Sequence, residues 1–272
     1  MLKVEIGSFS LNESQNLITI NSNSSLIGMR YFIECSYRGT NYSGWQIQEN
    51  ANTVQAEIEK GLSILMNETI SITGSSRTDA GVHAIHQVAH FDTENKGLNS
   101  ENLAYRLNKI LPFDISIKRI FPVKEDYHSR FEAKSRKYEY HISALKNPFK
   151  KGLFYEFNHD LNLELMNEAS QKLLQYIDFE CFSKIKTDVN TFNCNITEAS
   201  WERKENGTLI FQIKANRFLR GMVRAIVGTL VEVGAGKLSV DDFEQIILSK
   251  SRKKAGRAMP AEGLFLIEVN YD

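Results

Sequence analysis

Two hydrophobic periodicities follow each other along the chain, and their order restricts the fold more than any other feature of the sequence. After Arg136, charged side chains alternate strictly with aromatic or aliphatic ones up to Ile142, which is typical of a half-buried strand. Elsewhere apolar residues recur at helical spacing, as at Val54, Ile58 and Leu62. These patterns predict strands at 30–37, 69–73, 88–91, 115–123, 136–142, 196–201, 209–213 and 264–269, and helices at 54–65, 103–110, 166–176, 218–230 and 240–248.

The predicted strands arrive in consecutive pairs with helices between the pairs. This order favours an α+β fold, with a mainly antiparallel sheet packed by helices, over strict alternation of parallel strands and helices. With 272 residues the chain has room for one large domain or two moderate ones. We expect two similar subdomains that flank a central active-site cleft, a catalytic one at 30–145 and a second at 146–272. They follow a polar N-terminal extension, residues 1–29, to which we assign no function.

Composition excludes several classes of protein. Hydrophobic residues make up 42% of the chain and charged residues 24%, which is ordinary globular usage rather than that of a disordered chain. The longest apolar stretch, 222–233, is too short and too charged to span a membrane. The N-terminus lacks a secretion signal, and three widely spaced cysteines without a C-x-x-C pair are typical of reduced thiols. We therefore expect a soluble cytoplasmic protein without a membrane partner.

Positive charge is concentrated in three windows, although the formal net charge is zero. Residues 118–151 hold ten Lys and Arg against four acids, residues 214–224 hold four against none, and residues 250–257 hold five against none. An acidic body with basic stripes can bind a polyanion on one side if the fold brings the stripes together. Each window alone is equally compatible with a solvated face.

Two other motifs do not support a function. The run Gly234 to Lys237 resembles a phosphate loop, but Leu238 stands where such a loop needs Ser or Thr. His83, His86 and His90 would share one face of a helix and could there hold a metal ion. Because this stretch has the pattern of a strand, we expect no metal site, and a metal hydrolase is only a minor alternative.

The segment Arg77-Thr78-Asp79-Ala80-Gly81-Val82-His83 is the strongest candidate for a catalytic site. A carboxylate between a strand end and a glycine turn is exposed enough to meet a substrate, and Arg77 can keep Asp79 ionised by its proximity. This combination suits a nucleophile or a general base. The alternative is ordinary turn chemistry, in which the aspartate accepts hydrogen bonds from the local backbone. Tyr138, similarly, is either a core aromatic or a ring that stacks on a base.

The chain resembles the tRNA pseudouridine synthase A family over about residues 30–272. Five segments carry the resemblance in the family's order: Gly44-Trp45-Gln46, Ser76 to Ala84, His128 to Phe131 with Arg136 to Tyr140, Phe218 to Gly228, and Ala261-Glu262-Gly263-Leu264. The resemblance implies the pseudouridine synthase fold and an isomerase that converts uridine to pseudouridine at positions 38, 39 and/or 40 of the tRNA anticodon arm. It also implies a homodimer, with the tRNA lying across both subunits, and neither a metal nor an organic cofactor.

Site residues transfer from the family position by position. Asp79 matches the catalytic aspartate, which forms a covalent intermediate with the substrate. Arg77 would pair with this carboxylate and help to hold the nucleotide out of its stack. Tyr138 would stack on the flipped uracil where a proton must leave C5. Leu264 would line the pocket beneath the base, and Arg224 would contact RNA or support the aspartate.

Three positions depart from the family pattern. The chain has Arg38 where the family usually has Asp, Ser76 where it commonly has Gly, and Gly221 where it often has Asn or His. These positions flank the pocket and therefore bear on loop geometry and on which uridines are accepted. A catalytically inactive RNA-binding protein of the same fold is the main alternative, and it would bind tRNA without needing Asp79.

Overall fold

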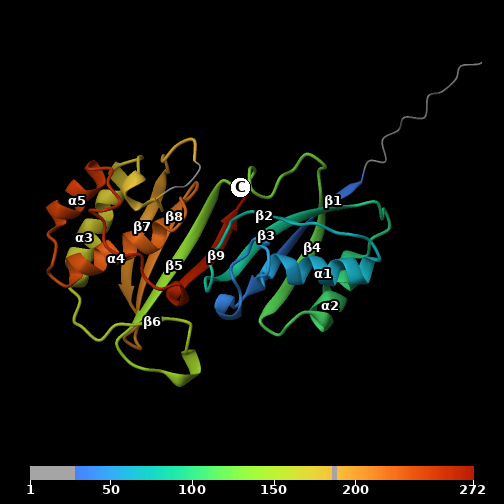
Figure 1. Ribbon diagram of the computed structural model, residues 1–272, viewed down its shortest axis with the longest axis horizontal. Coiled ribbons are helices and arrows are strands. Elements are labelled where there is room, and N and C mark those ends of the chain that lie inside the picture. Colours follow the sequence, from blue (N-terminus) through green and yellow to red (C-terminus); the bar gives the residue numbers. More distant parts are fainter. Residues whose placement is uncertain (1–27, 186–188) are drawn as a thin grey trace, which may run out of the picture.

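A nine-stranded sheet organises the computed structural model, which describes residues 28–185 and 189–272 (Figure 1). The strand order is β4-β1-β3-β9-β5-β8-β7, with β2 paired to β3 and β6 paired to β5. The strands are β1 (Met29–Tyr37), β2 (Thr73–Gly74), β3 (His83–Thr93), β4 (Ile115–Val123), β5 (Ser135–Ser143), β6 (Tyr155–Glu156), β7 (Ile196–Arg203), β8 (Leu209–Ala215) and β9 (Leu264–Asn270). The helices are α1 (Val54–Met66), α2 (Ser100–Ile110), α3 (Leu163–Lys172), α4 (Met222–Gly234) and α5 (Val240–Leu248).

The predicted α+β fold with a mainly antiparallel sheet is confirmed. Among the pairings of the described strands, β3 with β9 and β5 with β6 are parallel, and the others are antiparallel. The strict alternation at residues 136–142 becomes β5, whose buried face carries Arg136, Tyr138, Tyr140 and Ile142. No helix in the described ranges is both long and apolar enough to cross a membrane.

The strand predicted at residues 69–73 is wrong for most of its length, because only Thr73 and Gly74 pair with β3. Side chains of α1 accept hydrogen bonds from the backbone amides that would otherwise bind a neighbouring strand. The Ile70 amide donates to the Ser63 hydroxyl at 3.0 Å, and the Ile72 amide donates to a Glu59 carboxylate oxygen at 2.8 Å. The segment is therefore fastened to the helix and joins the sheet only at its end.

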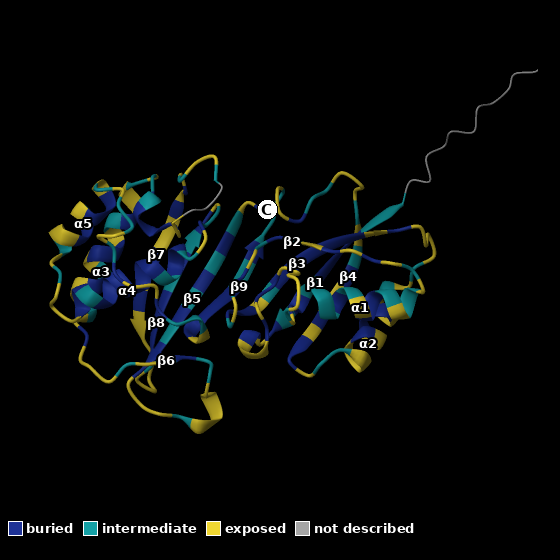
Figure 2. Cartoon of the chain, viewed as in Figure 1, coloured by how far each residue is buried: buried dark blue, intermediate teal, exposed yellow. Residues whose placement is uncertain are grey.

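Two groups of helices cover the two ends of the sheet, as Figure 1 shows. Helix α2 packs on β4 with α1 beside it, whereas α3 packs on β7, and α4 and α5 pack against α3. The central strands β9 and β5 lie between the groups, and buried residues run along both of them (Figure 2). The buried apolar side chains form one cluster that includes residues from both groups. The expected division of the chain at residue 145 stays a prediction, and the predicted extension at 1–29 falls almost entirely outside the described residues.

Candidate active site

The loop between β2 and β3 carries Asp79, and its neighbour Thr78 fixes the loop. The Thr78 hydroxyl shares a 2.7 Å hydrogen bond with the Tyr37 hydroxyl on β1, and the Thr78 carbonyl accepts from the Trp45 amide at 3.1 Å. Gly44 lies against the same carbonyl with a φ of +101°, and a Cβ there would come within 2.5 Å of the carbonyl oxygen. Only glycine fits this approach, so the turn before Trp45 clamps the base of the Asp79 loop.

The Asp79 carboxylate faces two guanidinium groups and no backbone donor. Arg220 Nε lies 3.8 Å from one carboxylate oxygen, and Arg224 Nη1 lies 3.6 Å from the other. The side chain is 32% exposed. Its main-chain carbonyl accepts from the Val82 amide, but within the described residues no hydrogen bond reaches the carboxylate itself. The ordinary-turn alternative needs such local hydrogen bonds. The carboxylate is therefore accessible and flanked by positive charge.

Arg220 lies in the loop just before α4 and Arg224 lies in the first turn of α4, and a close backbone contact holds this helix in place. Gly221, with a φ of +71°, precedes the first helical residue. The Arg224 guanidinium donates to the Met259 carbonyl, and the Met259 amide donates to the Arg224 carbonyl at 3.0 Å. One turn later, a Cβ on Gly228 would lie 1.9 Å from the Arg257 carbonyl oxygen. The segment before β9 is thus packed directly onto the start of α4.

Tyr138 and Leu264 lie on one face of the central strands. Tyr138 on β5 is buried, and its ring meets the Phe218 ring edge-on with centroids 5.1 Å apart. Burial raises the pKa of Tyr138 to about 12, although Arg136 and a hydrogen bond with Ser76 act in the opposite direction. The hydroxyl is therefore neutral near pH 7. Leu264 pairs with Tyr140 across β9 and β5, two residues from Tyr138, and it is also buried.

Arg77 is exposed, and it makes no ion pair with Asp79 or with any other carboxylate in the described ranges. Arg220 was missed by reasoning from the sequence, although it falls inside the basic window 214–224. Its position directly before the glycine that starts α4 was the available signal. Arg224, assigned to RNA contact or to aspartate support, does lie beside the carboxylate.

Residues of the first two basic windows contact the Asp79 loop, and the third window packs on α4. The first contributes Arg136, which donates to the Ser75 carbonyl at the base of the loop at 3.1 Å. The second contributes Arg220 and Arg224. The third includes Arg257, whose carbonyl packs on α4. Of these residues, Arg220 is exposed and can meet a polyanion, whereas the Arg136 guanidinium is buried and bound to protein carbonyls.

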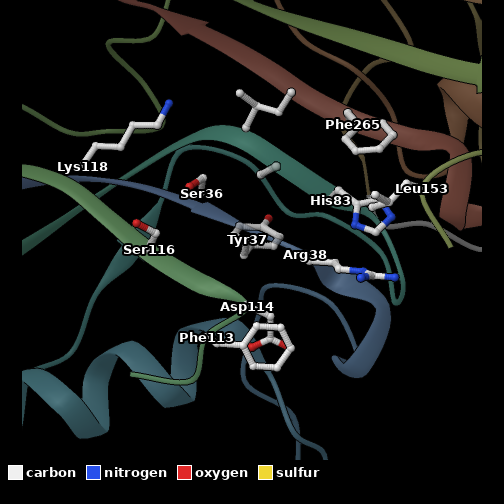
Figure 3. Close-up of a pocket in the computed structure, with 12 residues that line it drawn as sticks. Ser36, Tyr37, Arg38, His83, Phe113, Asp114, Ser116, Lys118, Leu153 and Phe265 are labelled. Atoms are coloured by element: carbon white, nitrogen blue, oxygen red, sulfur yellow. The ribbon is translucent and has the colours of Figure 1, made fainter. Parts of the chain in front are cut away.

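A cavity of about 460 Å³ lies elsewhere, beside β1, β3 and β4. Figure 3 shows Arg38, His83, Asp114 and Lys118 among the residues that line it. Asp79 and its two arginines do not line this cavity. Arg38, one of the departures from the family pattern, thus belongs to a different surface from the carboxylate.

The three histidines considered for a metal ion are engaged separately. His83 Nδ1 accepts from the Gly39 amide at 3.0 Å, and His90 Nδ1 shares a 2.8 Å hydrogen bond with the Ser129 hydroxyl. His86 lies 3.7 Å from a Glu34 carboxylate oxygen. In the part of the chain that the structure describes, no group of three or more His, Cys, Asp or Glu is placed to hold a metal ion.

Comparison with known proteins gives a consistent result. A family model described as tRNA pseudouridine synthase matches residues 35–132 and 169–272. A tRNA pseudouridine synthase A from Parabacteroides distasonis is 50% identical over 242 residues, which is 89% of this chain and 96% of the relative. Proteins of the same name from Porphyromonas gingivalis, 50% identical over 89% of the chain and 97% of the relative, and from Acetivibrio thermocellus, 45% identical over 86% and 96%, are also similar.

Proposed function

This chain belongs to the tRNA pseudouridine synthase family, whose members are isomerases, and we propose that it isomerises uridine in the anticodon arm of tRNA with Asp79 as nucleophile. The observation that carries the proposal is the Asp79 carboxylate, which is one-third exposed, free of backbone donors and flanked by Arg220 and Arg224. An accessible carboxylate of this kind can form a covalent bond to a substrate carbon.

The proposed reaction breaks the bond between uracil N1 and ribose C1′ while an Asp79 oxygen bonds to C1′. The detached uracil, which is left with the negative charge at N1, turns within the pocket. C5 then displaces the carboxylate from C1′, the C5 proton passes to water, and N1 takes up a proton. Atoms balance within one nucleotide, so the chemistry requires neither an oxidant nor a nucleotide fuel. The pocket must keep the uracil in place and keep water away from C1′.

The remaining site residues would hold the uridine outside its stack. Flipping a nucleotide costs a few kcal/mol, and an aromatic face offsets part of this cost. We assign the Tyr138 ring to the uracil, Leu264 to the floor of the pocket and the exposed Arg77 to the RNA backbone. Because the pKa of Tyr138 is about 12, its neutral hydroxyl acts as a hydrogen-bonding group rather than as a phenolate base.

The homodimer with tRNA across both subunits and the cytoplasmic location belong to the same proposal. The three basic windows supply the positive charge for the tRNA backbone. A chain with zero net charge can bind a polyanion in this way because most of its acidic residues lie elsewhere in the sequence.

A tritium-release assay tests the proposal. The wild-type protein, given unmodified tRNA transcript with tritium at uridine C5, is expected to release tritium to water. Asp79→Asn, which keeps the shape of the side chain, is expected to release none, and Asp160→Asn, at an exposed carboxylate, should behave as wild type. Release by Asp79→Asn at the wild-type rate would remove the assigned role. If the wild type binds tRNA but releases no tritium from several tRNAs, the inactive RNA-binding alternative holds instead.

A further inference from the structure

Arg136 on β5 is a buried guanidinium without a carboxylate partner among the described residues. It is 8% exposed and lies two residues before Tyr138. A buried charge is costly unless hydrogen bonds satisfy it. Here four backbone carbonyls do so: Nη1 donates to Ala133 at 2.8 Å and to Asn216 at 2.9 Å, and Nη2 donates to Arg130 at 2.6 Å and to Ser75 at 3.1 Å.

These carbonyls belong to segments on both sides of the Asp79 carboxylate. Ser75 begins the loop that carries Asp79, whereas Asn216 begins the loop that carries Arg220 and leads into α4. The other two carbonyls lie in the segment just before β5. One side chain therefore joins the loop of the nucleophile to the loop of its cationic partner.

The base of the Asp79 loop is buried, polar and hydrogen-bonded around this contact. The Ser75 hydroxyl donates to the Gln87 side-chain oxygen at 2.7 Å, and the Gln87 side-chain Nε2 donates to the Ser76 carbonyl at 2.8 Å. Both Ser75 and Gln87 are buried. The Arg136 bridge ties this hydrogen-bonded loop base to the segment that leads into α4.

We propose that Arg136 is a positioning residue, which sets the Asp79 carboxylate against Arg220 and Arg224 by binding the carbonyls of both loops at once. The proposal rests on the proposed role of Asp79. Arginine suits this position because its planar fork directs five N–H donors to different sides, whereas the three donors of lysine radiate from one compact ammonium group. A lysine therefore reaches only part of the carbonyl set.

This role predicts that Arg136 affects the rate of catalysis but not the affinity for tRNA. In the described structure the donors of Arg136 are directed at protein carbonyls, so its removal should leave the affinity for tRNA almost unchanged. Displacement of a reacting group by about 1 Å can cost roughly 100-fold in rate. We expect Arg136→Lys and Arg136→Ala to lower kcat for tritium release by about that factor, with little change in KM for tRNA.

The experiment compares these variants with Arg30→Ala. Arg30 forms two hydrogen bonds with Asp92 and lies seven residues before Tyr37 on β1, roughly 23 Å along the strand. Millimolar guanidinium ion should raise kcat of Arg136→Ala by refilling the site and should leave Arg30→Ala unchanged. Hydrogen exchange should become faster at residues 75–81 and 216–221 in Arg136→Lys and in Arg136→Ala, but not in Arg30→Ala.

Several outcomes would overturn the assignment. These are a wild-type kcat in a folded Arg136 variant, a parallel loss of tRNA affinity, or equal stimulation of both alanine variants by guanidinium. If Arg136→Ala does not fold, Arg136→Lys supplies the kcat, KM and exchange measurements. If the wild type itself releases no tritium, the proposed function fails, and exchange at the two loops alone decides whether Arg136 positions them.

Discussion

Asp79 meets solvent with about a third of its side-chain surface, and its charged partners are guanidinium groups held at ion-pair distance. An aspartate that serves only a turn uses its oxygens to bind nearby amides. In Asp79 the main-chain carbonyl closes the turn by accepting from Val82, which leaves the carboxylate outside that structure. This division of tasks within one residue is the physical basis for assigning it a chemical role.

Tyr138→Phe tests the part of the site that is not charged. The ring and its edge-on contact with Phe218 remain, whereas the neutral hydroxyl beside the Asp79 loop is lost. We expect tritium release to slow by about 100-fold, as for loss of a group that assists proton transfer. The affinity for tRNA, measured by filter binding, should hardly change, and Tyr105→Phe, at an exposed ring on α2, is the control. If the variant loses rate and affinity to the same extent, Tyr138 acts only by stacking on the base.

The departure at Gly221 has a structural explanation. The residue before α4 adopts a left-handed conformation, and a Cβ there would touch nothing within 4 Å. Glycine adopts this conformation freely, and Asn and His are among the other residues most often found in it. The residues that the family uses here thus share one backbone requirement, and Gly221 preserves the geometry that delivers Arg220 and Arg224.

At the scale of elements, the contact between α4 and the segment before β9 leaves no room for a side chain. Gly228→Ala would place a methyl group 1.9 Å from the Arg257 carbonyl, so the helix must shift and carry Arg224 with it. We expect a loss of about 1–3 kcal/mol in the free energy of unfolding by urea, together with slower tritium release. Gly97→Ala, in an exposed turn with room for a Cβ, should change neither quantity. A Gly228 variant with wild-type stability and rate would contradict this packing.

Strand β3 buries two histidines, and this makes stability depend on pH. Burial lowers the pKa of His83 and of His90 to about 4, whereas an unfolded histidine titrates near 6.5. The unfolded chain therefore binds more protons between pH 6.5 and 4, and the free energy of unfolding falls as the pH falls through this window. Each histidine contributes at most about 1.4 kcal/mol per pH unit. His90→Asn should make the decline in urea stability shallower, and exposed His159→Asn should not; equal slopes would refute the argument.

Reasoning from the sequence worked where one periodicity ran uninterrupted. The bounds of β4 and α5 agree with the prediction, because apolar spacing and flanking breakers coincide there. Strand β3 is longer than predicted, since buried polar residues such as His83 and Gln87 interrupt its apolar pattern. The parallel pairing of β3 with β9 joins residues far apart in the sequence, as in His83 with Phe265, and no local pattern encodes it. The Arg220 contact was missed for the same reason.

For the whole molecule, we expect tRNA binding to depend steeply on salt. Lys253 and Lys254 are exposed in the third basic window, next to the segment that packs on α4. If each neutralises one phosphate, changing both to Gln should reduce the slope of log K against log salt by about 1.4 to 1.8. The rate at saturating tRNA should stay the same. The matched double variant at exposed Lys60 and Lys96 should keep the wild-type slope, and identical slopes in both double variants would place the RNA on another surface.

The strand order of the sheet also determines when its strands can pair during protein synthesis. Strand β9 is the last strand along the chain, yet it lies between β3 and β5 and joins the two sets of strands. A nascent polypeptide can pair β1, β3 and β4 while still attached to the ribosome, but the central gap closes only after residues 264–270 leave the exit tunnel. The two sets of strands therefore join only after residues 264–270 have been made, so the Asp79 loop and Tyr138 come together late in the folding of the chain.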